Sequence, residues 1–279
     1  MICYILYALG YSKNKGGISM NNDTKVNKLK SFNFKMGFLH LIQGILMLGF
    51  ALGFEKIRLF KMPIWSYFLK FDVNQMKLVT ESNQLGEVPY GILVSAFLLL
   101  SAIAHFIIVS PKGFRKYKED IVLGINKFRW YEYSISSSLM IFLISLLFGV
   151  YDIGALIAIV LLNAAMNFFG LLMEEINQYK EKIDWKPFIF GSIAGIGPWI
   201  IIFIYAFGNS DPSKIPWFVY WIVSSYFVFF NLFPINMFLQ YKKIGKWKDY
   251  LYGERNYIIL SLIAKSVLAW LVFAGVMQP

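Results

Sequence analysis

Long apolar runs alternate with polar connections along most of this chain, which is the pattern of membrane-spanning helices. A helix needs about 20 mostly apolar residues to cross a bilayer. Seven runs qualify as transmembrane helices: Met36–Phe54, Tyr90–Val109, Ile121–Val150, Ala155–Met173, Phe188–Phe207, Trp217–Leu239 and Tyr257–Val276. We expect the third of these runs to begin outside the membrane, because its first turns, from Ile121 to Lys127, are mildly polar.

The connection after the first run, Glu55–Pro89, is 35 residues long. Connections of that length are usually functional or disordered. This one contains two aromatic and β-branched pieces, Ile64–Phe68 and Met76–Thr80, which favour strands. We therefore expect a small β-hairpin here.

Residues 1–35 are expected to form an N-terminal segment, distinct from a seven-helix domain of residues 36–279. The apolar piece Ile2–Leu9 is too short to cross a membrane, and no positive charge precedes it as in a signal peptide. Met20 is a plausible alternative start, so residues 1–19 are expected to be disordered or untranslated.

Positive charges are distributed unevenly between the two sides of the predicted bundle. Of 27 lysines and arginines, 20 lie in the N-terminal segment, the second, fourth and sixth connections and the polar start of the third run. Six lie in the other connections, and Lys265 lies inside the last run. Positive residues accumulate on the cytoplasmic side of membrane proteins. The N-terminus is therefore predicted in the cytoplasm, with the C-terminus and the hairpin outside.

Composition narrows the class of protein. The chain is 58% hydrophobic and 15% charged, whereas a soluble domain carries about 25% charged residues. An integral protein of the cell membrane is therefore expected. The net charge of +11 lies in the connections, where it acts as an orientation signal, so no nucleic-acid partner is expected. No metal-ligand cluster, phosphate loop or nucleophile elbow supports catalysis.

Lys265 lies deep in the last apolar run, at a cost of roughly 3 kcal/mol on insertion scales. Glu132 is the one acidic residue well inside a run, and a buried cation needs a buried anion. At about 1.5 Å per residue, Lys265 lies about 12 Å from Tyr257, and Glu132 about 16 Å from Ile121. The similar depths predict an ion pair. The alternatives are snorkelling of the lysine and pairing of Glu132 with Arg129.

Further polar residues are expected near this pair. His40, near the start of the first run, and His105, near the end of the second, fall toward the same side, which suggests an inner polar cavity. Hydrogen bonds between helices are the alternative for each histidine. Gln43 could extend the network, and Ser261 shares a helical face with Lys265 and could bond its nitrogen.

A lysine in the seventh helix and a carboxylate in the third resemble the arrangement of retinal proteins, and local motifs resemble heliorhodopsins in particular. The resemblance covers about Met36 to the C-terminus. The inverted topology of that family agrees with the charge count. The motifs are Arg129-Trp130-x-Glu132-Tyr133-Ser134-x-Ser136-x-Ser138, Ser261-Leu-x-Ala-Lys265-Ser-x-Leu-Ala-Trp270, Asn231-x-Phe233-Pro234-x-Asn236, and His40, Gln43 and His105.

The resemblance implies a seven-transmembrane-helix, rhodopsin-like bundle with all-trans retinal on Lys265 as a protonated Schiff base. Glu132 would be its counterion and Ser261 a second hydrogen-bond partner. His40, His105 and Gln43 would belong to the inner cavity that receives the proton. Candidate pocket residues, each with ordinary helix packing as the alternative, are Met166, Gly170, Trp199 and Phe230.

Members of the family dimerise through helices four and five and the first outer loop, which implies a homodimer here. In the fifth run, Gly191 and Gly195 supply a small-residue face suited to close approach of helices.

A light-driven proton pump of the microbial type needs carboxylates on both sides of the Schiff base. Four and eleven residues after Glu132 stand Ser136 and Leu143, and no other run contributes an acid at mid-depth. A light sensor with an unidentified cytoplasmic partner is therefore the favoured function. Three alternatives stay open: a light-gated or light-driven ion or proton conductor, a chromophore-free transporter or channel, and an enzyme regulator that acts through the basic loops Lys112–Arg129 and Tyr241–Arg255.

Overall fold

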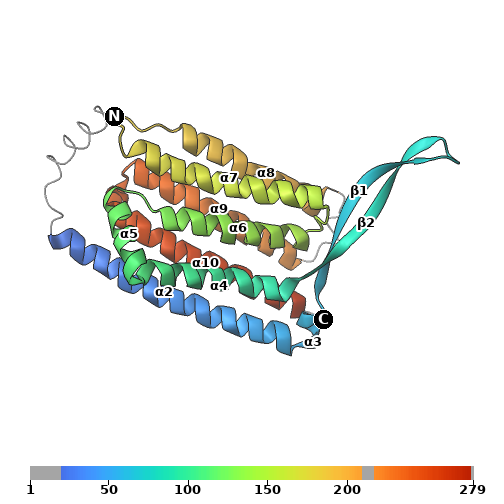
Figure 1. Ribbon diagram of the computed structural model, residues 1–279, viewed down its shortest axis with the longest axis horizontal. Coiled ribbons are helices and arrows are strands. Elements are labelled where there is room, and N and C mark those ends of the chain that lie inside the picture. The colour runs from blue at the N-terminus through green and yellow to red at the C-terminus, as the bar shows by residue number, and fades with distance from the viewer. Residues whose placement is uncertain (1–19, 209–216, 278–279) are drawn as a thin grey trace.

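Long helices that lie side by side and alternate in direction form the body of the molecule (Figure 1). The structure is a computed structural model, which describes residues 20–208 and 217–277. Each of the seven predicted apolar runs lies in a helix for most of its length, so the predicted helical bundle is confirmed. The prediction for residues 1–19 lies outside the described residues. The helices are α2 (Met20–Gly53), α4 (Tyr90–Val109), α6 (Lys127–Leu147), α7 (Ile153–Asn177), α8 (Lys186–Phe207), α9 (Trp217–Tyr241) and α10 (Tyr250–Met277).

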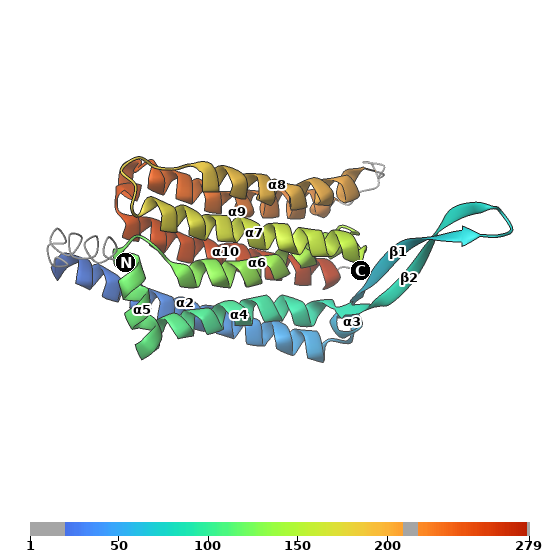
Figure 2. The ribbon, with the colours of Figure 1, turned by 45° about the horizontal axis from the view of Figure 1, so that its top comes forward.

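Helix length and composition agree with a membrane bundle. In the described part of the chain, five helices are long and apolar enough to cross a membrane: α2, α4, α6, α7 and α8. Helices α9 and α10 have 25 and 28 residues and run beside them in the same bundle (Figure 2).

A two-stranded hairpin projects from one end of the bundle (Figure 2). It follows the short helix α3 (Glu55–Arg58) and consists of β1 (Lys61–Asp72) and β2 (Lys77–Pro89), paired antiparallel. The Trp65 amide donates to the Tyr151 carbonyl at 2.9 Å, which anchors the base of the hairpin to the connection between α6 and α7. The predicted hairpin is therefore confirmed, although its strands are longer than the two pieces that suggested it.

The predicted start of the third span was wrong. Ile121 belongs to a separate helix, α5 (Pro111–Val122), which lies across the end of the bundle (Figure 1). The chain then turns at Gly124, whose φ of +76° is a conformation that glycine adopts readily. The Asn126 side chain accepts a hydrogen bond from the Arg129 amide and caps α6. The polar start of the run is therefore an amphipathic helix and a turn, and not a projecting extension of the span.

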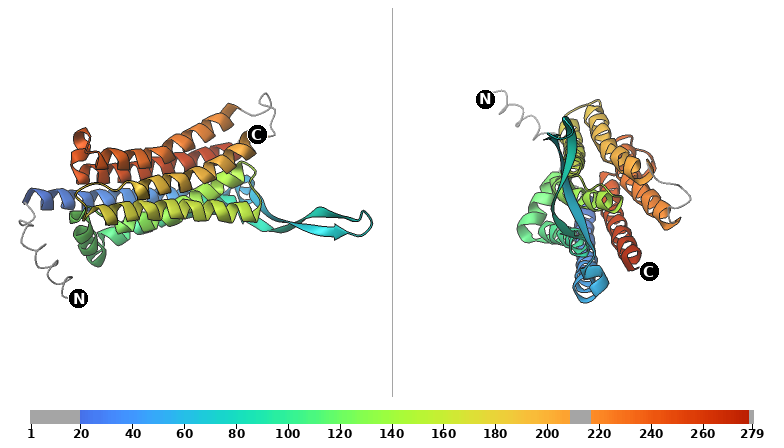
Figure 3. Two further views of the ribbon diagram at one scale, coloured as in Figure 1. Left: turned by 90° about the horizontal axis from the view of Figure 1, so that it is seen from above. Right: turned by 90° about the vertical axis from the view of Figure 1, so that its right-hand side faces the viewer.

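The two ends of the bundle carry different connections, as Figure 3 shows for the hairpin and the end opposite to it. We call the end with the hairpin the hairpin end. The opposite end, with α5, the connection from α7 to α8 and the 3-10 helix η2 (Gly245–Lys248), we call the basic end. The connections predicted on the cytoplasmic side all meet at the basic end.

Buried side chains divide by level along the bundle. The largest apolar cluster lies toward the hairpin end and includes Phe97, Leu143, Ile144 and Leu268. The buried carboxylates Asp120, Glu174 and Glu254 lie toward the basic end, with Lys265 between the two regions. This division places the buried carboxylates on one side of the lysine and the largest apolar cluster on the other.

Candidate functional site

The lysine inside the last helix is held by partners from two other helices. Lys265, on α10, is 3% exposed. Its Nζ lies 2.6 Å from Glu132 Oε1 on α6 and 2.5 Å from Ser101 Oγ on α4. Ser101 Oγ also lies 2.6 Å from Glu132 Oε1, so the hydroxyl donates to the carboxylate and accepts from the lysine. The three side chains link α4, α6 and α10.

The surroundings of Lys265 suit a buried cation. The Tyr133 ring lies 5.4 Å from Nζ, within the range of a cation–π contact. The Glu132 side chain is only 12% exposed, so each charge depends on the other for compensation. The structure thus brings together the two residues that the sequence paired, and Lys265 does not snorkel to the surface of the bundle.

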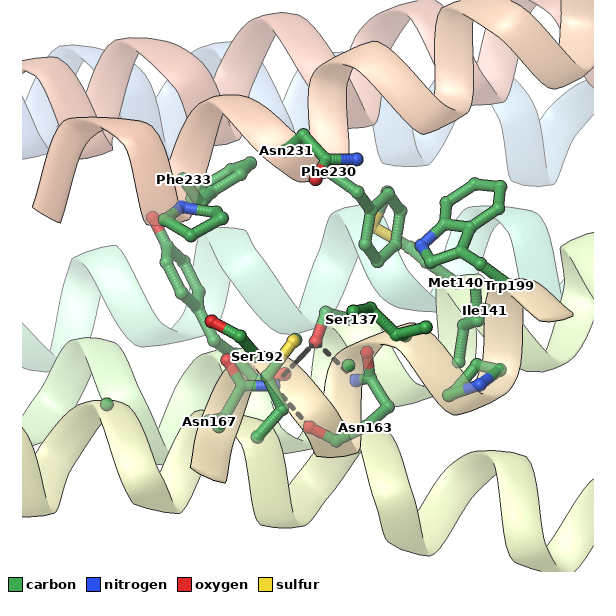
Figure 4. A pocket seen from close by; sticks show the side chains of 18 of the residues that line it. Ser137, Met140, Ile141, Asn163, Asn167, Ser192, Trp199, Phe230, Asn231 and Phe233 are labelled. Carbon is green, nitrogen blue, oxygen red and sulfur yellow. Dashed lines mark hydrogen bonds between the residues drawn. The ribbon is translucent and has the colours of Figure 1, made fainter. Parts of the chain in front are cut away.

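A cavity of about 490 Å³ begins at Lys265 and runs between α6, α7, α8, α9 and α10. Its volume falls within the roughly 300–1,000 Å³ of small-molecule and cofactor sites. All four residues predicted for a pocket line it: Met166, Gly170, Trp199 and Phe230. The walls are mostly apolar, and the Trp199 and Phe230 rings meet edge to face at 5.5 Å (Figure 4). An elongated apolar cofactor with one end at the lysine fits this shape.

Glycines in two walls let the helices approach closely. A methyl group at Gly170 would overlap the Trp130 ring, so α7 meets α6 there only because this position is glycine. Methyl groups at Gly191 and Gly195 would lie 3.0 Å from Phe169 and 2.5 Å from Met166. The small-residue face of α8 therefore packs against α7 of the same chain.

One part of the cavity wall is polar, which the sequence did not predict. Asn163 and Asn167, on α7, each donate to Ser137 Oγ, at 2.8 and 3.1 Å (Figure 4). The two asparagines are four residues apart and so share a helical face. That spacing within an apolar run was the available signal. The three side chains give the otherwise apolar wall one hydrogen-bonding patch.

A second, much smaller cavity lies on the other side of Glu132, toward the basic end. Its volume is about 30 Å³, enough for one water molecule. Ser101, His105, Glu132 and Ser261 all border it. Ser261 is therefore close to the site, but the hydrogen bonds that the structure gives to Lys265 come from Ser101 and Glu132.

The two histidines lie together beside this small cavity. The rings of His40 and His105 stack with their centroids 5.5 Å apart. His105 Nδ1 lies 2.8 Å from Asn33 Oδ1. Neither ring nitrogen of His40 has a hydrogen-bond partner among the described residues, and the same holds for Gln43 Oε1. The structure thus brings the histidines together but joins neither of them to Gln43 by a hydrogen bond.

Comparison with known families agrees with a bundle built around a lysine-ended cavity. A family model described as Heliorhodopsin matches residues 29–277 of the chain. The chain belongs to the heliorhodopsin family. It is therefore a retinal-binding, rhodopsin-like, multi-pass membrane protein. A search among curated proteins found no match to this chain.

This heliorhodopsin also contains a buried ionic cluster that the sequence did not predict, which we call the Arg129 cluster: Arg129, Glu174 and Glu254. The guanidinium of Arg129, on α6, pairs with Glu174 on α7 and with Glu254 on α10. Both carboxylate residues are 1% exposed. The cluster joins three helices near the basic end. Arg129 therefore pairs with these two acids and not with Glu132, its alternative partner from sequence.

Glu132 is thus not the only acid buried in the bundle, although Glu174 and Glu254 lie near helix ends and not well inside a predicted run. The predicted spans ended at Met173 and began at Tyr257, which left Glu174 and Glu254 in loops. Helix α7 extends to Asn177 and α10 begins at Tyr250, so both acids lie inside helices. The overlooked signal was Arg129, because an arginine inside a helical bundle needs carboxylate partners.

Proposed function

We propose that the chain is a light sensor in which all-trans retinal is joined to Lys265 as a protonated Schiff base, with Glu132 as counterion. The observation that carries the proposal is the position of one amine. Lys265 borders the large cavity, and its Nζ lies 2.6 Å from Glu132. Among the described residues that line the cavity, no other bears an amine. An aldehyde bound there would meet a single nitrogen nucleophile.

Bound retinal would supply the absorption of light and, on isomerisation, the displacement of the N–H group at Lys265. Glu132 stabilises positive charge on that nitrogen, since a carboxylate within hydrogen-bond reach favours the charged form. Ser101 donates to Glu132 at 2.6 Å and so fixes the carboxylate oxygen that faces the lysine. The walls around Trp199 and Phe230 are mostly apolar, so they offer water few hydrogen-bond partners.

The proton released at Lys265 would move toward the basic end. His105 borders the small cavity beside Glu132, and His40 is stacked on His105 with two ring nitrogens that have no hydrogen-bond partner in the described chain. We assign both histidines, with Gln43 beside them, to the proton-accepting region.

The placement of buried acids favours a sensor over a pump. A pump of the microbial type needs a proton acceptor and a donor on opposite sides of the chromophore. Apart from Glu132, the buried carboxylates of the described chain are Asp120, Glu174 and Glu254, and all lie toward the basic end. Toward the hairpin end the interior is the apolar cluster. A proton that leaves Lys265 thus has acceptors on one side only, and it would return by the same route.

Orientation and assembly belong to the same proposal. The charge count places the basic end in the cytoplasm, where a signalling partner would bind. The seven-helix domain would comprise residues 36–279, preceded by a cytoplasmic segment. A homodimer would form through α7, α8 and the hairpin. Gly191 and Gly195 face α7 of their own chain, so other residues of α8 would form the contact.

Reconstitution of the purified chain with retinal tests the proposal. We expect a visible absorption band that is lost in Lys265→Ala and retained in Lys127→Ala, whose lysine forms an exposed ion pair with Glu175. Glu132→Gln should keep the band but shift its maximum, because the negative charge beside the nitrogen is removed. A visible band that survives Lys265→Ala would rule out the attachment.

Light-driven ion or proton conduction is the second candidate, and electrical recording separates it from sensing. Membranes that contain the retinal-loaded protein should give no sustained photocurrent, because the apolar interior toward the hairpin end offers no path for an ion. A sustained current would favour the conductor. A chain that stays colourless with retinal would favour the chromophore-free transporter.

A further inference from the structure

With both of its acids ionised, the Arg129 cluster carries one uncompensated negative charge. Arg129 supplies one positive charge, and Glu174 and Glu254 supply two negative charges. The nearby Lys127 does not compensate it, because that lysine pairs with Glu175 at 3.0 Å on the surface. An unpaired charge in a buried site is costly. One additional proton would make the cluster neutral.

The two acids of the cluster differ in the number of hydrogen-bond donors around them. The Glu174 carboxylate accepts hydrogen bonds from four groups. These are the Arg129 guanidinium, the Trp130 indole at 2.6 Å, the backbone N–H of Asn126 at 3.0 Å and the Tyr250 hydroxyl at 3.3 Å. Glu254 accepts from two groups, the Arg129 guanidinium and the Asn126 side chain at 2.5 Å. Each donor favours the ionised carboxylate. Glu254 therefore has fewer donors, and of the two acids it alone borders the small cavity beside Glu132.

A route connects Glu254 with the lysine site. The small cavity of about 30 Å³ is bordered by Glu132 and Ser101 on one side and by Arg129 and Glu254 on the other. One water molecule in this space would connect the two groups of charges. Arg129 and Glu132 are three residues apart on α6, which is about 4.5 Å along the helix.

Other titratable groups near this route suit relaying better than storage. His105 borders the same cavity, and its Nδ1 is already bonded to Asn33 at 2.8 Å. The Tyr117 phenol, on α5, is fully buried, and burial holds its pKa well above the usual range, so it stays neutral. Neither residue carries a negative charge that a proton would cancel.

We propose that Glu254 is the resting place of the proton released at Lys265, an inference that rests on the proposed function. The N–H bond at the Lys265 nitrogen breaks, the nitrogen keeps the electron pair, and an O–H bond forms on Glu254. The Lys265–Glu132 pair changes from neutral to one negative charge, and the Arg129 cluster changes from one negative charge to neutral. The number of uncompensated buried charges stays constant, which makes the transfer reversible and leaves the proton inside the protein.

Light-minus-dark infrared spectroscopy of the retinal-loaded, full-length protein tests this assignment. When the visible spectrum reports loss of the proton at Lys265, a C=O band of a protonated carboxylic acid should appear. We expect that band to be lost in Glu254→Gln and shifted in Glu254→Asp. It should be unchanged in Glu175→Gln, a matched control on the surface ion pair with Lys127. If Glu254→Gln does not fold, the shift in Glu254→Asp decides the question.

Several outcomes would overturn the assignment. A carboxylic acid band that persists in Glu254→Gln, or one that disappears only in Glu174→Gln, would place the proton elsewhere. So would a wild-type protein that releases the proton at Lys265 without any such band. A wild-type chain that forms no visible band with retinal would instead overturn the proposed function, and this inference with it.

Discussion

Ser101 is the residue at which the charged pair meets a third helix. Its hydroxyl lies within 2.6 Å of both charged atoms, Lys265 Nζ and Glu132 Oε1. The two charged residues were predictable because an ion inside an apolar run is costly and needs a partner. Ser101 was not, because a serine in a membrane helix commonly bonds to its own backbone. Ser101 also lies 3.2 Å from the Phe97 carbonyl of its own helix. Its second role, at the ion pair, therefore follows only from how α4 packs against α6 and α10.

We predict that Ser101→Ala shifts the visible band and lowers stability. A hydrogen bond to a charged group contributes about 1.5–3 kcal/mol, and this change removes contacts to two charges. Ser95→Ala is the matched control, because Ser95 is equally buried on α4 but donates only to the Ile92 carbonyl at 2.7 Å. Absorption spectra and thermal unfolding of both variants provide the measurement. Identical spectra for the two variants would contradict the role of Ser101.

Among the elements, α6 carries both charged centres. Glu132 and Arg129 lie one turn apart and bind different sets of helices. Glu132 bonds to Ser101 on α4 and to Lys265 on α10, whereas Arg129 pairs with acids on α7 and α10. The existence of α6 followed from its apolar content, but its start did not. The turn at Gly124 and the cap at Asn126 set that start. Hydropathy reports the length of an apolar run and is insensitive to such local backbone features.

The Arg129 cluster should contribute much more to stability than a surface ion pair nearby. Removing one partner of a buried ion pair costs about 3–5 kcal/mol, because the remaining charge is left unpaired. We therefore expect Arg129→Gln to lower the free energy of unfolding by about that amount. Lys127→Gln should cost no more than about 1 kcal/mol, because its ion pair with Glu175 is exposed. Denaturant unfolding of both variants measures the difference, and equal losses would argue against the cluster as a clamp.

At the scale of the whole molecule, the seven helices and the hairpin were predictable, whereas the shape of the large cavity was not. Apolar runs and their connections determine how many helices the chain forms. The polar patch around Ser137 and Asn163 depends on which faces of α6 and α7 meet, and hydropathy carries no information on that contact. The four pocket residues came from family resemblance, and the structure places all of them in the lining of one cavity.

Orientation in the membrane can be tested with thiol labelling of intact cells. With Cys3 replaced by serine, we expect Val73→Cys, near the tip of the hairpin, to react with a membrane-impermeant reagent added outside. Lys246→Cys, in η2 at the basic end, should react only after the membrane is opened. Both positions lie in exposed parts of the structure. The reverse pattern would place the basic end outside and contradict the charge count.

The single amine in the described wall of the large cavity has a practical consequence for quantification. Under the proposed attachment at Lys265, the cavity holds no more than one covalently attached pigment molecule per chain. The chain also has 8 tryptophans and 17 tyrosines, which give it strong ultraviolet absorbance. The ratio of visible to ultraviolet absorbance is therefore an internal measure of stoichiometry, so any variant can be scored for the fraction of chains loaded without a separate protein assay.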